Sequence, residues 1–322
     1  MEQTVNTTNV SERQQFIDLF KKKGKLMYRW NKRGINKIAT SISPAYRDFV
    51  IKVLSNSKLK IERFVQRGYC KPSYQYQEDL SKRADCSIAV NFNDPDCFLH
   101  ELAHSLDFLF GYRMALTSNV IVQDGKTLHD IFDEEFKEHH EEIREFIMNE
   151  YRLNIDSNIY KGAYDIFINN MPKYLTLSSL EDKKARKKLH KELYECGFVE
   201  VYYQIGTKKC FKVLLQKYES ILDALSSIYN IEGMFLPGHE KEYYDLDDRR
   251  PVQEFFANVC VDKLMGYHTR YDQFIKLMPK SFNAFERLFV LIYDRIQNNK
   301  RFTDLKLVEQ EELVEEESEA KA

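Results

Sequence analysis

Two histidines four residues apart, His100 and His104, enclose a glutamate in the sequence His-Glu-Leu-Ala-His. On a helix, residues i and i+4 lie one above the other, so both imidazoles can reach the same metal ion. Zinc in catalytic sites takes three protein ligands and a water, and it lowers the pKa of that water to about 7. The pattern therefore predicts a zinc site held by His100 and His104, with Glu101 as the general base.

The residues around this motif predict the helix that must carry it. Residues 86–92 are apolar enough to form a strand, and Asp94 with Pro95 then supplies an N-cap followed by proline at the first helical position. Apolar residues cover most sides of the following segment, and Gly111 predicts its end. A buried helix with two histidines and a glutamate needs a strong partner for them. A metal suits all three better than the alternative, a pair of hydrogen-bonded core histidines.

Glu254 is the candidate for the third ligand. It lies in Pro-Val-Gln-Glu-Phe-Phe-Ala-Asn, residues 251–258, which the apolar pattern predicts as a second buried helix. Asn258, one turn later, is placed to accept a hydrogen bond from a ligand histidine and fix its tautomer. Asp107, three residues after His104, could serve the other histidine or cap a neighbouring backbone group; a solvated aspartate is the alternative.

The motif ending at Asp107 and the Glu-Phe-Phe-Ala-Asn motif starting at Glu254 resemble the metal motifs of lethal-factor-like zinc peptidases, a gluzincin group. Residues 222–229, the Gly-His pair ending at His239 and the tyrosines 243 and 244 are similar to zincin-like domains of phage head-morphogenesis and mobile-element proteins. The resemblance covers residues 59–112 and 220–266. It implies a zinc-dependent peptide hydrolase in which zinc is bound by His100, His104 and Glu254 and Glu101 is the base.

The chain departs from this pattern at position 247, which is Asp where lethal-factor-like enzymes have a tyrosine that stabilises the oxyanion. An oxyanion donor contributes about 3 kcal/mol in the transition state, so a replacement is expected. Tyr244, Tyr243 and His239 are the donors nearest in sequence. Tyr244 is the first choice, and packing is its alternative role.

A helical insertion over 129–230 is expected to separate the two parts of a catalytic core, 58–128 and 231–300. Within it, residues 131–148 have the apolar stripe of an amphipathic helix, and 183–193 form a basic helical stretch. The adjacent His139 and His140 point in different directions on a helix, which argues against a second metal site. We expect the insertion to form a lid or wall over the cleft. A helical segment, 1–57, precedes the core, and a glutamate-rich tail, 301–322, is expected to be disordered.

The fold class predicted is therefore α+β and helix-rich: a zincin-like domain with a small sheet, the histidine helix packed behind it and the Glu254 helix completing the site. Residues 59–65 alternate well enough to form a strand beside 86–92. In the N-terminal segment, apolar residues at helical spacing among many lysines and arginines predict one or two surface helices, and a docking arm for an acidic partner is the alternative.

Composition limits the partners. The 322 residues have a net charge of −2, so the basic stretches favour solvated helix faces, and nucleic-acid binding is the least favoured function. The start of the chain lacks a signal-peptide pattern, and six scattered cysteines suit reduced thiols, which predicts a cytoplasmic or virion-associated protein without a membrane span. Cys97 could reach the metal, although a buried thiol is favoured. The expected partners are a protein or peptide substrate and a virion or host protein; an inactive structural protein that keeps zinc is the alternative function.

Overall fold

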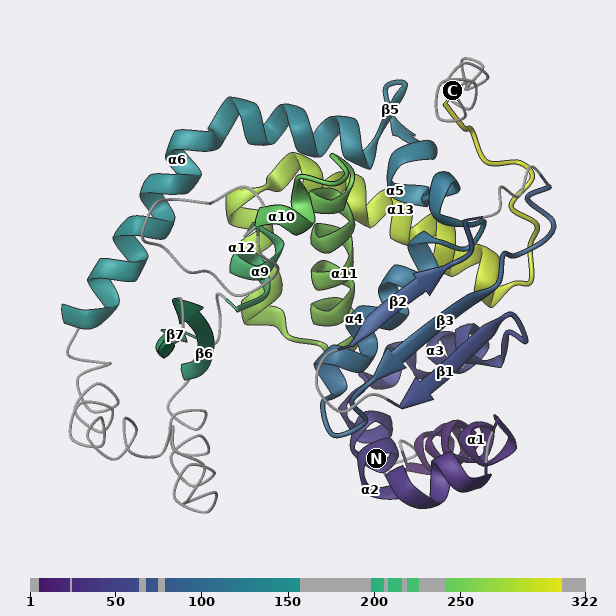
Figure 1. The fold of residues 1–322 in the computed structure, drawn as a ribbon. Coiled ribbons are helices and arrows are strands. Elements are labelled where there is room, and N and C mark those ends of the chain that lie inside the picture. Colours follow the sequence, from purple (N-terminus) through teal and green to yellow (C-terminus); the bar gives the residue numbers. More distant parts are fainter. Residues whose placement is uncertain are drawn as a thin grey trace, which may run out of the picture. The chain divides into compact units, whose positions relative to one another are not determined.

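The computed structural model describes residues 6–23, 25–63, 68–74, 79–156, 198–205, 208–215, 219–225 and 241–308. The chain divides into two compact units. Unit 1 comprises Met1–Asp133 and Asn283–Ala322, and unit 2 comprises Glu134–Phe282. Within the described residues, both are rich in helix, and unit 1 also holds a small mixed sheet (Figure 1), as the α+β prediction requires.

The sheet of unit 1 has three strands in the order β1-β3-β2. β1 (Leu59–Arg63) runs parallel to β3 (Cys86–Val90), and β2 (Tyr69–Pro72) is antiparallel to β3. The central position of β3 matches its apolar sequence, since four of its five residues are buried. Both predicted strands are confirmed, and β2 lies at an edge of the sheet.

Helix α4 (Pro95–Asp107) follows β3 and carries the histidine motif. It begins as predicted: Asp94 is the N-cap, its carboxylate accepts a hydrogen bond from the Cys97 backbone N–H at 3.2 Å, and Pro95 occupies the first turn. It ends at Asp107, before Gly111. A separate turn follows the helix, in which the Gly111 backbone N–H donates to the Phe108 carbonyl oxygen at 3.0 Å. Gly111, with a positive φ of 102°, then precedes the short helix η2 (Tyr112–Met114).

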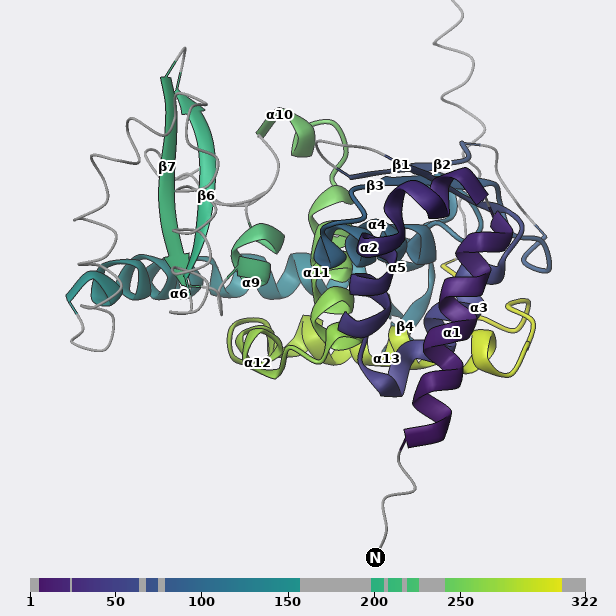
Figure 2. The same ribbon diagram turned by 90° about the horizontal axis from the view of Figure 1, so that it is seen from below.

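Three N-terminal helices pack on the same side of the sheet as α4 (Figure 2). They are α1 (Asn6–Lys23), α2 (Lys25–Ser41) and, after the turn η1 (Pro44–Tyr46), α3 (Arg47–Ser55). The sequence predicted one or two helices here, and the structure has three; their buried apolar residues include Phe16, Phe20, Ile35, Ile38 and Phe49. The close packing of α2 requires Gly34, since a Cβ there would lie 2.2 Å from the Phe92 carbonyl oxygen.

The remaining described elements of unit 1 are short, apart from the long helix α13. After α5 (Leu116–Asn119), strands β4 (Ile121–Gln123) and β5 (Lys126–Thr127) form a hairpin. Asp124 and Gly125 make its turn with φ values of 50° and 77°, the pattern of a two-residue hairpin loop. Most of α13 (Pro279–Gln297) belongs to this unit, and the chain then returns to form a bridge between Leu307 and Val120.

Unit 2 is built around helix α11 (Arg250–Met265), which is buried along almost its whole length. Helices α9 (Glu219–Ala224) and α12 (His268–Leu277) pack against it, and α10 (Lys241–Tyr244) precedes it. The unit also contains the hairpin β6 (Phe198–Ile205) and β7 (Lys208–Leu215) and most of α6 (Leu128–Asp156), which includes the amphipathic helix predicted for 131–148.

The disordered tail predicted for 301–322 is wrong for its first residues, because Phe302 is buried and Leu307 forms the bridge to Val120. The rest of that tail, after residue 308, and the basic stretch 183–193 lie outside the described residues. Among the residues that are described, none of the helices has the length and apolar character needed to cross a membrane.

Candidate metal centre

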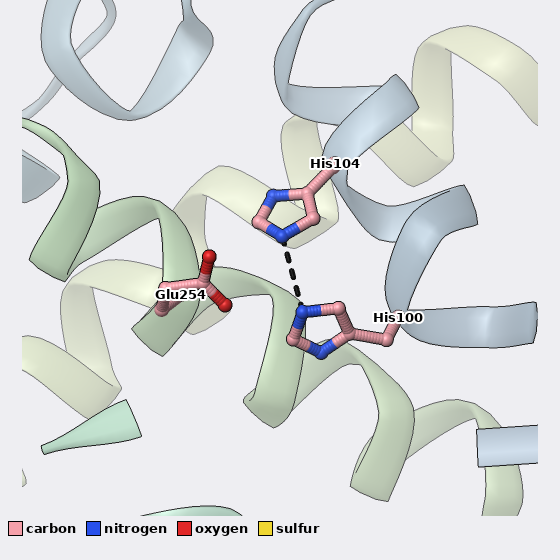
Figure 3. A group of neighbouring side chains, drawn as sticks. All are labelled: His100, His104 and Glu254. Carbon is pink, nitrogen blue, oxygen red and sulfur yellow. Dashed lines mark hydrogen bonds between the residues drawn. The ribbon is translucent and has the colours of Figure 1, made fainter. Parts of the chain in front are cut away.

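The two histidines of α4 face one another (Figure 3). The Nε2 atoms of His100 and His104 are 3.1 Å apart, and the ring planes are nearly perpendicular at 83°. His104 is buried, whereas His100 is half-buried. Two nitrogens bound tetrahedrally to one zinc, each at its usual distance, lie about 3.3 Å apart. The pair is therefore already close to the spacing that a shared zinc ion requires.

Glu101 is buried beside the start of the edge strand. Its side chain is 8 % exposed. A Cβ at Gly68, the residue before β2, would lie 2.5 Å from Glu101 Oε1 and 2.7 Å from Cys97 Sγ. Gly68 thus leaves the space that the Glu101 carboxylate occupies. The motif does not reveal this role of Gly68, because the two residues are distant in sequence.

Cys97, one turn before His100, is a half-buried thiol. Burial raises its pKa to about 11. Without a bound metal the side chain is therefore a thiol at neutral pH, and it is less buried than the sequence predicted.

Asp107 is fully buried. Its Oδ1 accepts a hydrogen bond from the Thr117 backbone N–H at 2.8 Å, and its Oδ2 accepts one from the Thr117 hydroxyl at 3.1 Å. Of the roles predicted for Asp107, capping a neighbouring backbone group is therefore confirmed. The solvated alternative is excluded by its burial, and the carboxylate joins the end of α4 to α5.

Glu254, on α11, is 2 % exposed and accepts a hydrogen bond from the Tyr243 hydroxyl at 3.0 Å. Burial and the nearby Glu254 charge raise the pKa of Tyr243, so the hydroxyl stays protonated and continues to donate. The Arg250 guanidinium lies 4.2 Å from the Tyr243 ring centroid and also donates to the Tyr243 carbonyl oxygen. Together these contacts hold the tyrosine against the carboxylate.

The two neighbouring tyrosines have different surroundings. Tyr243, one of the three donors near in sequence, is the one that contacts Glu254. Tyr244 is 7 % exposed, and its ring packs edge-on against that of Tyr243 with centroids 5.1 Å apart. His239, the oxyanion donor proposed as the alternative to Tyr244, lies outside the described residues.

Asn258 lies one turn after Glu254 on α11, as predicted, and is the donor in two hydrogen bonds. Its Nδ2 donates to the Glu254 carbonyl oxygen at 3.0 Å and to Asp223 Oδ2 at 2.8 Å. Asp223, on α9, was not singled out in the sequence, although an acidic residue beside the buried Ile221 and Ala224 is a signal for a buried polar contact. A second bond, from the Ser220 hydroxyl to Asp262 at 2.8 Å, also ties α9 to α11.

His100, His104 and Glu254 are the candidate ligand set. One ligand atom from each lies within 4.8 Å of the others (Figure 3). Among the described residues, no second group of three or more His, Cys, Asp or Glu side chains is placed to hold an ion. Two imidazole nitrogens and a carboxylate oxygen are a donor set that catalytic zinc uses. These are the three residues that the sequence predicted as ligands.

Comparisons with known proteins do not assign the chain to a family. No family model, no curated protein and no solved structure matches it. The functional assignment therefore rests on the side chains of the candidate centre.

Proposed function

We propose that this protein is a zinc-dependent endopeptidase with a zincin-like catalytic core. The observation that carries the proposal is the pair of Nε2 atoms on α4, 3.1 Å apart, with the Glu254 carboxylate as the candidate third donor. Buried polar side chains need strong partners, and zinc satisfies this set. The proposal includes Glu254 as the ligand supplied by α11.

Bound zinc would supply a Lewis acid that polarises the substrate carbonyl and acidifies the attacking water. Glu101, which lies between the two histidines in sequence and is buried on the same helix, would accept a proton from that water and deliver it to the leaving amine. Tyr243 would hold the Glu254 carboxylate in place through its 3.0 Å hydrogen bond. Tyr244 and His239 remain the proposed donors to the oxyanion.

A protein or peptide is the proposed substrate. Strand β2 is an edge strand: in the described residues it pairs with β3 alone. An extended peptide can add to such an edge through its backbone hydrogen bonds. Gly68, just before β2, adjoins Glu101, so a peptide along this edge would pass close to the proposed base. Phage or mobile-element association, which the motif resemblance implies, is also part of the proposal.

A zinc-keeping protein without peptidase activity is the second candidate. The observation in its favour is at Asp247, where the resembled enzymes have their oxyanion tyrosine. The Asp247 carboxylate instead accepts hydrogen bonds from the Arg249 side chain at 2.9 and 2.7 Å and from the Arg249 backbone N–H at 3.0 Å. This position therefore stabilises the start of α11 and provides no oxyanion donor.

Metal analysis and peptide cleavage, measured on the same preparations, test the proposal. We expect about one zinc per wild-type chain and a sharp loss of zinc in Glu254→Gln, with an unchanged content in Glu286→Gln as a matched control on α13. Glu101→Gln should keep zinc and lose cleavage of a fluorogenic peptide library. Zinc binding without cleavage in the wild type would support the second candidate. A wild type that takes up no zinc would refute both.

A further inference from the structure

The first two helices carry a strong local positive charge that the net charge of the whole chain conceals. Residues 6–41 contain nine lysines and arginines but only two acidic residues, whereas the 322-residue chain has a net charge of −2. One of the two, Asp18, is already paired with Lys21 at 2.6 Å. Charge segregated onto one element indicates a contact surface for a polyanion.

The fold turns this charge outward on α2. Its inner face packs within unit 1 through Gly34, Ile35, Ile38 and Ala39, while Arg29, Trp30, Lys32, Arg33 and Lys37 are exposed. Arg29, Arg33 and Lys37 follow one another at intervals of four residues, which sets successive cations about 6 Å apart along one stripe. The outer face of α2, defined by these five exposed residues, is therefore a linear array of positive charge.

Trp30 stands beside this stripe and is 69 % exposed, although it is the only tryptophan in the chain. It is three residues before Arg33, so the indole and the guanidinium are neighbours on the helix surface. None of the ion pairs found in the described residues involves Arg29, Lys32 or Arg33. Lys37 Nζ donates to the Asn93 carbonyl oxygen at 3.1 Å, so Arg29, Lys32, Arg33 and the indole ring are the groups available to an external ligand.

We propose that the outer face of α2 binds single-stranded nucleic acid without sequence preference. The lysines and arginines would contact phosphates, and Trp30 would stack on an unpaired base, the combination that sequence-tolerant single-strand binding uses. An anionic membrane surface fits less well, because Trp30 is the one large apolar side chain exposed among the described side chains of α1 and α2. An acidic protein is the other alternative, because arginine and tryptophan are enriched in protein interfaces although lysine is depleted, and competition with polyglutamate tests it. The proposal is independent of the zinc chemistry.

The single tryptophan makes the experiment site-specific. Titrating the full-length protein with an oligothymidine of about 12 nucleotides should quench the emission of Trp30 as the ring stacks. In parallel, the affinity for a labelled oligothymidine is measured by anisotropy between about 50 and about 200 mM salt. Polyglutamate and phosphatidylserine vesicles serve as the competing probes.

Charge and stacking variants separate the two contributions. Replacing Arg29 and Arg33 together by Gln should reduce the slope of log affinity against log salt by about 1.4, because each phosphate contact to a single strand contributes about 0.7. Trp30→Ala should weaken binding by about tenfold, whereas Trp30→Phe should retain most of the affinity. The matched control replaces Arg287 and Arg301, two exposed arginines of α13 and the segment after it, by Gln and should bind like the wild type.

Three results would overturn the proposal. One is unchanged Trp30 emission with saturating oligothymidine; another is equal loss of affinity in the control double variant. The third is tighter binding of polyglutamate or of the vesicles than of the oligonucleotide, which would assign the outer face of α2 to an acidic protein or to a lipid surface. Because all substituted residues are exposed, the variants should fold, and circular dichroism checks this.

Discussion

Replacing Gly68 by alanine should impair catalysis while leaving the fold intact. The added Cβ would lie 2.5 Å from Glu101 Oε1, whereas an ordinary contact begins near 3.4 Å, so the carboxylate must move by about 1 Å. The Cβ would also lie 2.7 Å from Glu101 Cγ and from Cys97 Sγ, so both side chains must give way, which costs less stability than a shift of the backbone. A misplacement of about 1 Å at a catalytic group reduces the rate by about 100-fold. We therefore expect that loss in kcat, with zinc content unchanged.

Two other glycines provide controls with different outcomes. Gly125 has a φ of 77° and open space around its Cβ position, so Gly125→Ala should cost about 1 kcal/mol of stability and leave the rate unchanged. At Gly34 the obstacle is the backbone carbonyl of Phe92, 2.2 Å away, which cannot move without shifting the chain. Gly34→Ala should therefore destabilise unit 1 far more than either of the other two substitutions.

The assay compares kcat on a fluorogenic peptide library with zinc content and urea denaturation for each variant. Glu101→Gln defines the rate without the proposed base. A Gly68→Ala protein that cleaves at the wild-type rate would refute the argument that Gly68 leaves room for the productive position of Glu101. A Gly68→Ala protein that loses zinc or unfolds would refute the expectation that this substitution impairs catalysis without affecting zinc binding or the fold.

Three further predictions concern other contacts. Tyr243→Phe removes the hydroxyl that donates to the third ligand and should weaken zinc affinity about tenfold in a chelator competition, while Tyr244→Phe should not. Glu135, fully buried, accepts three hydrogen bonds at the start of α13, at 2.8, 2.7 and 2.6 Å, so Glu135→Ala should lower the free energy of unfolding by about 3 kcal/mol, measured in urea. Hydrogen bonds from the Ser81 hydroxyl and backbone lower the pKa of Asp79 to about 2, so its stabilisation is present above pH 4 and lost as pH falls through about 2; Asp79→Asn and wild type should differ in stability at neutral pH and converge at about pH 2.

Local sequence patterns predicted the elements of the candidate centre because their signals are contained within a few residues. The apolar run of β3, the Asp94 cap and the proline after it led directly to α4. The spacing of His100 and His104 then places both rings on one helix face, whatever the rest of the chain does. The end of α4 was predicted less well, since Gly111 serves the following turn.

Roles that depend on distant residues could not be predicted in the same way. Whether Tyr243 or Tyr244 contacts Glu254 depends on how α10 lies against α11, and adjacent residues on a helix point in different directions. Likewise, the Asp107 carboxylate has a defined role only once α5 is folded against it.

The sequence by itself determined the chemistry that is possible here, because residue type and helical spacing decide which atoms can converge on one ion. Tertiary structure alone decided that Gly68 makes room for Glu101 and that the cations of α2 face outward around Trp30. The physical reason is that close packing and exposure are set by contacts between residues far apart in the chain, which no local periodicity encodes.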